Sequence, residues 1–221
     1  MEKIKNKLED AKLWDKIVEH ELHALWKYGV ERISNSAIKN SVVDFLEEEA
    51  PLGFFVNTVS RTSKHHPKWQ CQKAGILRNT TECCLAAKMQ LQIYKEFCDE
   101  NDQVLPEPLD IVLAATILSD TFKYDNDILI SKMSREKARL NRDHGKIAAN
   151  IWRDKYAKRH KIGSAVEKEI FNATYWHLGR WTNGWTTKTK LPLLSEIVHR
   201  LDMIFTDKSL ELLYNPKREI K

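Results

Sequence analysis

The chain has 221 residues, of which 42% are hydrophobic and 30% are charged, and its formal net charge is +5. This length suits one domain with a small appendage, and so mild a positive charge permits binding to nucleic acid without requiring it. No apolar run approaches the roughly 20 residues that a membrane-spanning helix needs, so a membrane partner is not expected.

Helices are predicted along the first half of the chain, because only seven glycines and six prolines interrupt the whole sequence. Residues 8–33 place their apolar side chains near one helical face. Residues 34–51 begin with cap-type residues and stop before a proline. The stretch 53–60, GFFVNTVS, fits a strand as well as a helix, and residues 80–101 form a strongly amphipathic helix.

The second half continues this pattern. Residues 106–122, PEPLDIVLAATILSDTF, open with prolines and are apolar almost throughout, which predicts a central, buried helix. Two further helices are predicted over residues 141–159 and 164–177. A loop, RWTNGWTTKTKLP, precedes a last helix over 193–206. The fold class predicted from the sequence is therefore all-α, with about seven or eight helices and no convincing sheet.

The cysteines are Cys71, Cys83, Cys84 and Cys98, and they lack paired C-x-x-C spacing. They are expected to be reduced thiols, as in cytosolic proteins. The first residues, MEKIKNKLEDAKLWDK, are charged throughout and do not have the pattern of a signal peptide. A cytoplasmic location is therefore expected.

Acidic and imidazole side chains recur near the predicted helix ends. Asp120 ends the buried helix, and His144 lies early in the helix that follows. His177 ends the next helix, and Asp202 lies inside the last one. Two carboxylates and two imidazoles can together hold a divalent cation. Each residue also has an ordinary structural interpretation, such as a turn cap for Asp120 or an exposed first-turn position for His144, and spacing alone does not bring the four together.

Five motifs occur in the order in which HD-domain phosphohydrolases carry them: GILRNT, ILSDTFK, RDHGKIAANIW, YWHLGRWT and LPLLSEIVHRLDMI. The chain therefore resembles this family over about residues 60–207, and the lead-in KHHPKW resembles that of HD-type 3′-to-5′ exoribonucleases. The resemblance implies an HD-domain-like helical bundle over 60–207. Residues 1–59 are then a helical N-terminal extension that the resemblance does not cover, and residues 208–221 a C-terminal tail.

The resemblance also implies that one of the family's metal sites is degenerate. Asn79 and Ser119 stand where the family has metal-binding histidines. The aspartate of the HD pair is kept as Asp120 and the closing aspartate as Asp202, while Leu178 replaces the second histidine of the HHG motif. Two neutral oxygens in place of two imidazoles suit magnesium or calcium weakly and transition metals poorly.

The other half of the two-metal arrangement implied by the resemblance is kept as Asp120, His144 and His177, with Asp202 as a weak or indirect ligand. This half could hold one divalent cation, Mn, Mg or Zn, and an ion there can activate water. In that case Lys123 or Arg180 would stabilise the developing charge on a phosphoester. Loss of the other two ligands favours a pseudoenzyme over a one-metal hydrolase.

Basic residues surround the position of His144 in the sequence. Residues 131–163 carry many more lysines and arginines than acids, and we expect Arg142, Lys146 and Arg180 to face the mouth of a pocket. Such charges attract phosphates, although a solvated basic helix face is an equally good interpretation.

Three tryptophans lie close to His177. We expect Trp176 to be buried, whereas Trp181 and Trp185, in a loop with glycine, threonine and asparagine, can stack against a base.

The leading hypothesis is an HD-like protein that binds a phosphorylated nucleotide or a nucleic-acid phosphate as a pseudoenzyme. The first alternative is a divalent-metal-dependent phosphohydrolase of nucleotides or nucleic acid. The second is a protein-interaction or structural module, in which the N-terminal helix with Trp14 and Trp26 mediates a homodimer or binds a protein partner.

Overall fold

Nine α-helices and three shorter helical segments make up the regular structure of the computed structural model, which describes residues 1–60, 62, 65–97, 107–124, 127–128, 141–186 and 188–206. No strand occurs within these ranges, so the all-α prediction is confirmed for them. The α-helices are α1 (Glu2–Asp10), α2 (Lys16–Tyr28), α3 (Ser36–Glu48), α4 (Leu52–Val56), α5 (Gly75–Phe97), α6 (Pro108–Ser119), α8 (His144–Ile151), α9 (Ser164–Tyr175) and α10 (Leu193–Phe205). The shorter segments are the 3₁₀ turns η1 (Val30–Arg32) and η3 (Gly179–Trp181) and the π-helical η2 (Trp152–Ala157), which continues α8.

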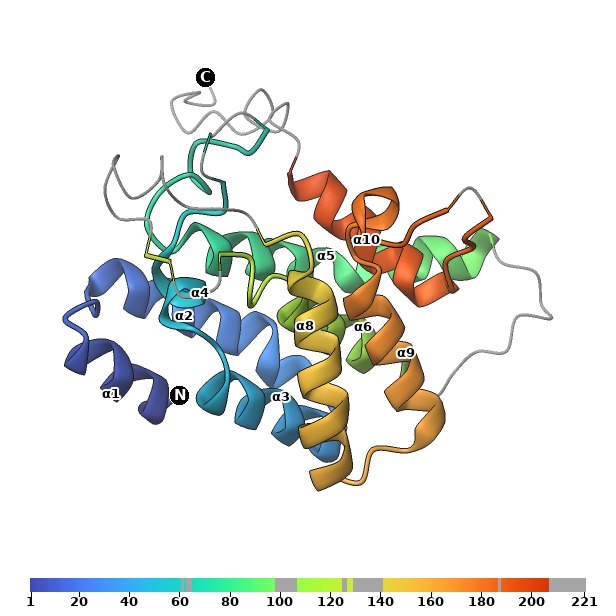
Figure 1. The fold of residues 1–221 in the computed structure, drawn as a ribbon, viewed down its shortest axis with the longest axis horizontal. Helices are drawn as coiled ribbons and strands as arrows, with labels where there is room; N and C mark the ends of the chain where they lie inside the picture. The colour runs from blue at the N-terminus through green and yellow to red at the C-terminus, as the bar shows by residue number, and fades with distance from the viewer. Residues whose placement is uncertain are drawn as a thin grey trace, which may run out of the picture.

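The predicted central helix is confirmed as α6, which contacts α3, α5, α8, α9 and α10 (Figure 1). Every residue from Asp110 to Ser119 is buried. Asp110, the acid at its first turn, accepts hydrogen bonds from the backbone nitrogens of Ser34 at 3.0 Å and Asn35 at 2.7 Å, and from the Ser34 hydroxyl at 2.8 Å. The start of α6 is thus fastened to the loop before α3.

One cluster of buried apolar side chains extends from Ile4 in α1 to Leu201 in α10. Within it α2 packs on α5 and α3 packs on α6. The predicted boundary at residue 60 therefore does not separate two hydrophobic cores, and the N-terminal helices help to build the scaffold on which α5 and α6 lie.

The prediction of a single helix over residues 8–33 is wrong. The first helix ends at Asp10, and Lys12 then takes a positive φ of 58°. The Asp15 carboxylate accepts hydrogen bonds from the backbone nitrogens of Ile17 and Val18, both at 3.0 Å, which starts a new helix. Apolar periodicity continues across this break and hides it, but an aspartate N-cap is a strong helix start. The stretch 53–60, left open between strand and helix, contains most of the short helix α4.

The apolar face of these N-terminal helices is already used within the chain. Leu8, Leu22 and Leu25 are completely buried, and Trp14 and Trp26 are half-buried. Much of this face is therefore covered within the chain, and the homodimer or protein partner suggested by its amphipathic pattern stays a prediction.

Among the helices that the structure describes, none is both long and apolar enough to cross a membrane. The predicted tail over 208–221 and the basic residues between 131 and 140 lie outside the described residues.

Candidate metal centre

The site is built around Asp120, which directly follows the last residue of α6 and is buried. Its Oδ2 accepts a hydrogen bond from the Lys123 ammonium at 2.8 Å. Burial by itself raises the pKa of Asp120, but that pKa is held well below its usual range, and the charge of Lys123 is the largest opposing cause. Asp120 is therefore an ionised carboxylate in the interior.

Two histidines present the same ring nitrogen to this carboxylate. His144 begins α8 and its Nδ1 bonds to the backbone carbonyl of Asn141, while His177 follows α9 and its Nδ1 bonds to the carbonyl of Thr174 at 2.9 Å. A carbonyl can only accept a hydrogen bond, so Nδ1 carries the hydrogen in both rings. In the neutral rings each Nε2 is consequently an acceptor with a free lone pair.

These acceptors converge on one point. The two Nε2 atoms are 2.9 Å apart, and Asp120 Oδ1 lies 3.1 Å from Nε2 of His144 and 3.6 Å from that of His177. Burial lowers the pKa of His144, so a proton is a disfavoured occupant of the space between them. Three buried acceptors without a donor fit a cation, and two imidazoles oriented by carbonyl groups with one carboxylate are a common ligand set for a divalent metal. The prediction that this group can hold a metal ion is confirmed by the geometry.

A glycine allows the two histidines to meet. A Cβ placed on Gly145 would lie 2.5 Å from Nδ1 of His177 and 2.7 Å from the Thr174 carbonyl oxygen. Only a residue without a side chain lets the first turn of α8 approach the end of α9 so closely. This explains why a glycine directly follows His144 in the sequence.

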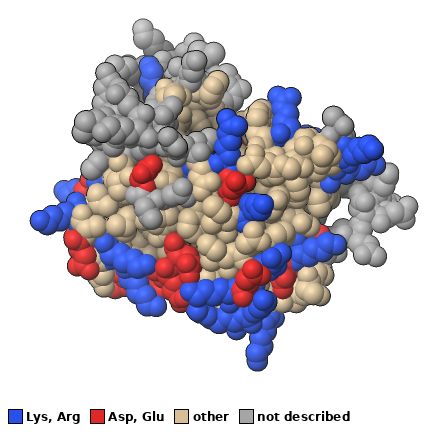
Figure 2. Space-filling view, in the orientation of Figure 1, with Lys and Arg blue, Asp and Glu red and all other residues tan. Residues whose placement is uncertain are grey.

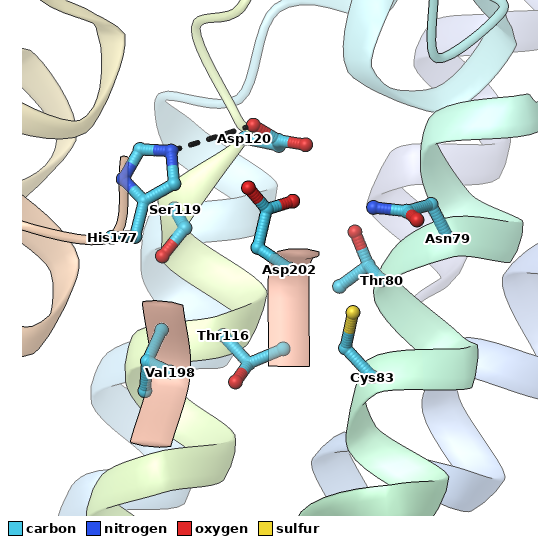
Figure 3. A pocket seen from close by; sticks show the side chains of 9 residues that line it. All are labelled: Asn79, Thr80, Cys83, Thr116, Ser119, Asp120, His177, Val198 and Asp202. Carbon is cyan, nitrogen blue, oxygen red and sulfur yellow. Dashed lines mark ion pairs between the residues drawn. The ribbon is translucent and has the colours of Figure 1, made fainter. Parts of the chain in front are cut away.

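Asn79, Ser119, Asp120 and Asp202 line one small cavity, as the order of motifs predicts (Figure 3). Its remaining lining residues are Thr80, Cys83, Thr116, His177 and Val198. The space open to the centres of water-sized molecules is about 20 Å³, which admits roughly one water.

The cavity is rich in oxygen acceptors. Within the described part of the chain, Oδ1 of Asn79 and Oγ1 of Thr116 are buried without a hydrogen-bond partner. Burial and the nearby charge of Asp120 raise the pKa of the half-buried Asp202. The site thus has a nitrogen-rich side at His144 and His177 and an oxygen-rich side in the cavity, and Asp120 lies between them.

The basic residues expected at the pocket mouth do not line the cavity. Arg142 and Lys146 are exposed, and the Lys146 ammonium lies 6.0 Å from the centroid of the Tyr175 ring. Arg180 is also exposed, with its guanidinium 4.7 Å from the Trp181 ring centroid. Their predicted contact with a ligand stays a prediction.

Part of the basic run instead pairs with acids at the C-terminal end of α3. Arg159 lies 2.7 Å from Glu48, and Lys155 lies 2.5 Å from Glu49. Figure 2 shows basic and acidic side chains interleaved along the lower edge of the molecule rather than a continuous basic patch. For these residues the solvated, ion-paired interpretation holds.

The aromatic loop is only partly buried. Trp181 is 50% exposed. Trp185 is half-buried, with its ring centroid 6.2 Å from that of Trp176. Trp176 is itself half-buried, so the expectation that it is buried is only partly confirmed. Trp181 is accessible to a ligand, but none of the three lines the cavity.

Sequence reasoning missed two groups of residues at this site. Cys83 lies four residues after Asn79, and Thr116 lies four before Asp120, so helical spacing could have identified both. His199 lies three residues before Asp202 in the sequence, but its contact with the loop after α9 depends on tertiary packing and could not be read from that spacing.

Comparison of the chain with protein-family models, with curated protein sequences and with solved structures finds no match.

Proposed function

We propose that the protein is a cytoplasmic HD-like protein that binds the phosphate of a nucleotide or nucleic-acid ligand at a centre for one divalent cation. The observation that carries this proposal is the convergence of Asp120 Oδ1 with Nε2 of His144 and His177, three buried acceptors without a donor. The order of the five motifs supports the HD-like assignment and, with it, the phosphorylated class of ligand.

The centre is proposed to hold one ion rather than two. To bridge two metals through its two oxygens, Asp120 would need both of them free, but Oδ2 already accepts from Lys123 at 2.8 Å. The ammonium thus supplies the positive charge on that side. Asn79 and Ser119 offer no imidazole to a second transition metal, and the Ser119 hydroxyl is itself bonded to the Ala115 carbonyl at 2.6 Å.

Hydrolysis of a phosphoester is the second candidate, and the cavity favours it. Three protein ligands leave coordination positions open, and a bound divalent ion supplies Lewis acidity toward phosphate oxygens and lowers the pKa of water. Beside the ligands, the cavity has room for about one water, with Asp202 and Asn79 in its wall to accept hydrogen bonds from it. Lys123 stabilises Asp120 in this arrangement, which leaves the exposed Arg180 as the predicted partner of the phosphate.

The test begins with metal analysis of purified protein supplied with Mn, Mg or Zn. One equivalent of ion is expected, and its loss is expected in Asp120→Ala. A panel of nucleotides and short oligonucleotides then measures binding and turnover, with binding expected to weaken as salt rises if Arg180 and its basic neighbours contact phosphate.

Each outcome selects one function. Binding without turnover supports the pseudoenzyme, and metal-dependent turnover supports the phosphohydrolase. Absence of bound metal and of any phosphate-dependent thermal stabilisation would overturn both and leave the protein-interaction module.

A further inference from the structure

The metal ligand His177 is held at two separate points. Its ring is fixed by the bond from Nδ1 to the Thr174 carbonyl at 2.9 Å. Its backbone carbonyl accepts a second hydrogen bond, at 2.7 Å, from Nδ1 of His199 in α10. Since a carbonyl only accepts, Nδ1 of His199 carries the hydrogen, and this bond joins α10 to the turn that follows α9.

The turn itself is shaped to receive the His199 ring. Gly179, two residues after His177, has a φ of +56°, and a Cβ there would lie 2.6 Å from both Cε1 and Nε2 of His199. The backbone of the turn is therefore in direct contact with the imidazole. The ring centroid of Trp181, in the same turn, lies 6.2 Å from that of His199. A side chain at position 179 would separate the turn from α10.

This contact acts on a turn between two helical segments. His177 lies outside regular structure, between α9 and η3, so its backbone position is set by the turn rather than by a helix. The same helix, α10, carries Asp202 three residues after His199, and residues at this spacing share a helix face. One face of α10 thus supplies a cavity-lining carboxylate and the donor that holds the carbonyl of His177.

We propose that His199 is a positioning residue for the metal centre. By fixing the carbonyl of His177, it holds the Nε2 of that ring against Asp120 and His144. It binds no metal itself, and its role rests on the proposed metal centre. Loss of a hydrogen-bonded partner that orients a ligand typically weakens metal affinity about 10- to 100-fold, and we expect a loss of this size in His199→Ala.

The experiment compares His199→Ala with His199→Asn, titrating Co²⁺ into each metal-free protein and recording the visible absorption spectrum as a measure of ligand geometry. An asparagine amide can donate from about the position of Nδ1, so His199→Asn is expected to retain most of the affinity and the spectrum of the unchanged protein. His199→Gln is the matched control, because it also carries an amide but holds the amide nitrogen one bond further from the backbone, away from the position of Nδ1. Gly179→Ala disturbs the same contact while keeping the histidine, and should weaken Co²⁺ binding as His199→Ala does.

Unfolding of the metal-free proteins in urea shows whether each variant folds. If His199→Ala does not fold, Gly179→Ala and His199→Asn test whether His199 positions His177. Unchanged Co²⁺ affinity in both His199→Ala and Gly179→Ala would overturn the proposal, as would equal weakening in His199→Asn and His199→Ala. Failure of the unchanged protein to bind Co²⁺ would instead refute the proposed metal centre and this inference with it.

Discussion

Substitution of Gly145 by alanine tests the geometry of the metal centre most directly. The added methyl would lie 2.5 Å from Nδ1 and 2.6 Å from Cε1 of His177. Ordinary contact begins near 3.4 Å, so α8 and His177 must separate by about 0.9 Å. Overpacking of this kind costs about 1–3 kcal/mol, partly offset by the roughly 1 kcal/mol by which alanine favours a helix over glycine. The net expectation is a modest loss of stability, up to about 2 kcal/mol.

Metal binding should suffer more than stability, because ligand distances tolerate only about ±0.2 Å. We expect Gly145→Ala to lower the affinity for Mn²⁺ or Zn²⁺ at least tenfold, measured by calorimetric titration, while urea unfolding of the metal-free protein measures stability. Gly163→Ala is the matched control, since a Cβ at Gly163 meets nothing within 4 Å. A Gly145→Ala protein that binds metal within twofold of the unchanged protein would refute the assigned ligand geometry.

Three further predictions concern the same interior. Asp120→Ala leaves the Lys123 ammonium buried without its partner, so the free energy of unfolding in urea, measured without metal, should fall by about 3–5 kcal/mol. Restored stability in the double variant Asp120→Ala with Lys123→Met would identify the unpaired charge as the cause. Burial, aided by the Lys123 charge, lowers the pKa of His66 from 6.5 to about 4. Between these pH values the unfolded chain binds more protons than the folded one, so the free energy of unfolding should fall by about 3 kcal/mol as the pH falls from 6.5 to 4. A His66→Phe variant that keeps the full pH dependence would contradict this. Asn79→His with Ser119→His supplies the two imidazoles that the second site lacks, so elemental analysis should count a second equivalent of transition metal. An unchanged metal content would show that the Lys123 ammonium on Oδ2 of Asp120 or the size of the cavity excludes it.

The fold could be predicted where local chemistry and packing agree. A run that opens with prolines and is apolar on every side has to be buried, and α6 is. The break at Asp15 was missed because apolar spacing continues across it, although the N-cap residue itself was visible in the sequence. Prediction of α4 was ambiguous for another reason, since a five-residue apolar helix and a buried strand have the same composition.

The carboxylates and histidines of the site could be identified from the sequence, but their bonding could not, and the basic and aromatic residues expected beside them do not line the cavity. The order of motifs indicated that Asn79 and Ser119 would meet Asp120, and all three line one cavity. The pairing of Lys123 with Asp120 and the carbonyl partners of the histidines each join residues three positions apart, but the sequence does not show which of its possible partners each side chain takes. These bonds decide which nitrogen faces the centre and how many ions it can hold.

The anchoring of α6 at Asp110 gives the centre a remote determinant. Asp110 and Asp120 lie ten positions apart in the sequence, about 15 Å along a helix, and carry the hydrogen bonds at the two ends of one rod. Since its residues from Asp110 to Ser119 are all buried, this rod cannot slide or turn without repacking its neighbours. A change at the Ser34 loop that does shift α6 would therefore repack its neighbours and move Asp120 together with the helix. A substitution in this loop is thus expected to change the affinity of the proposed centre for metal, although the loop supplies no ligand to it.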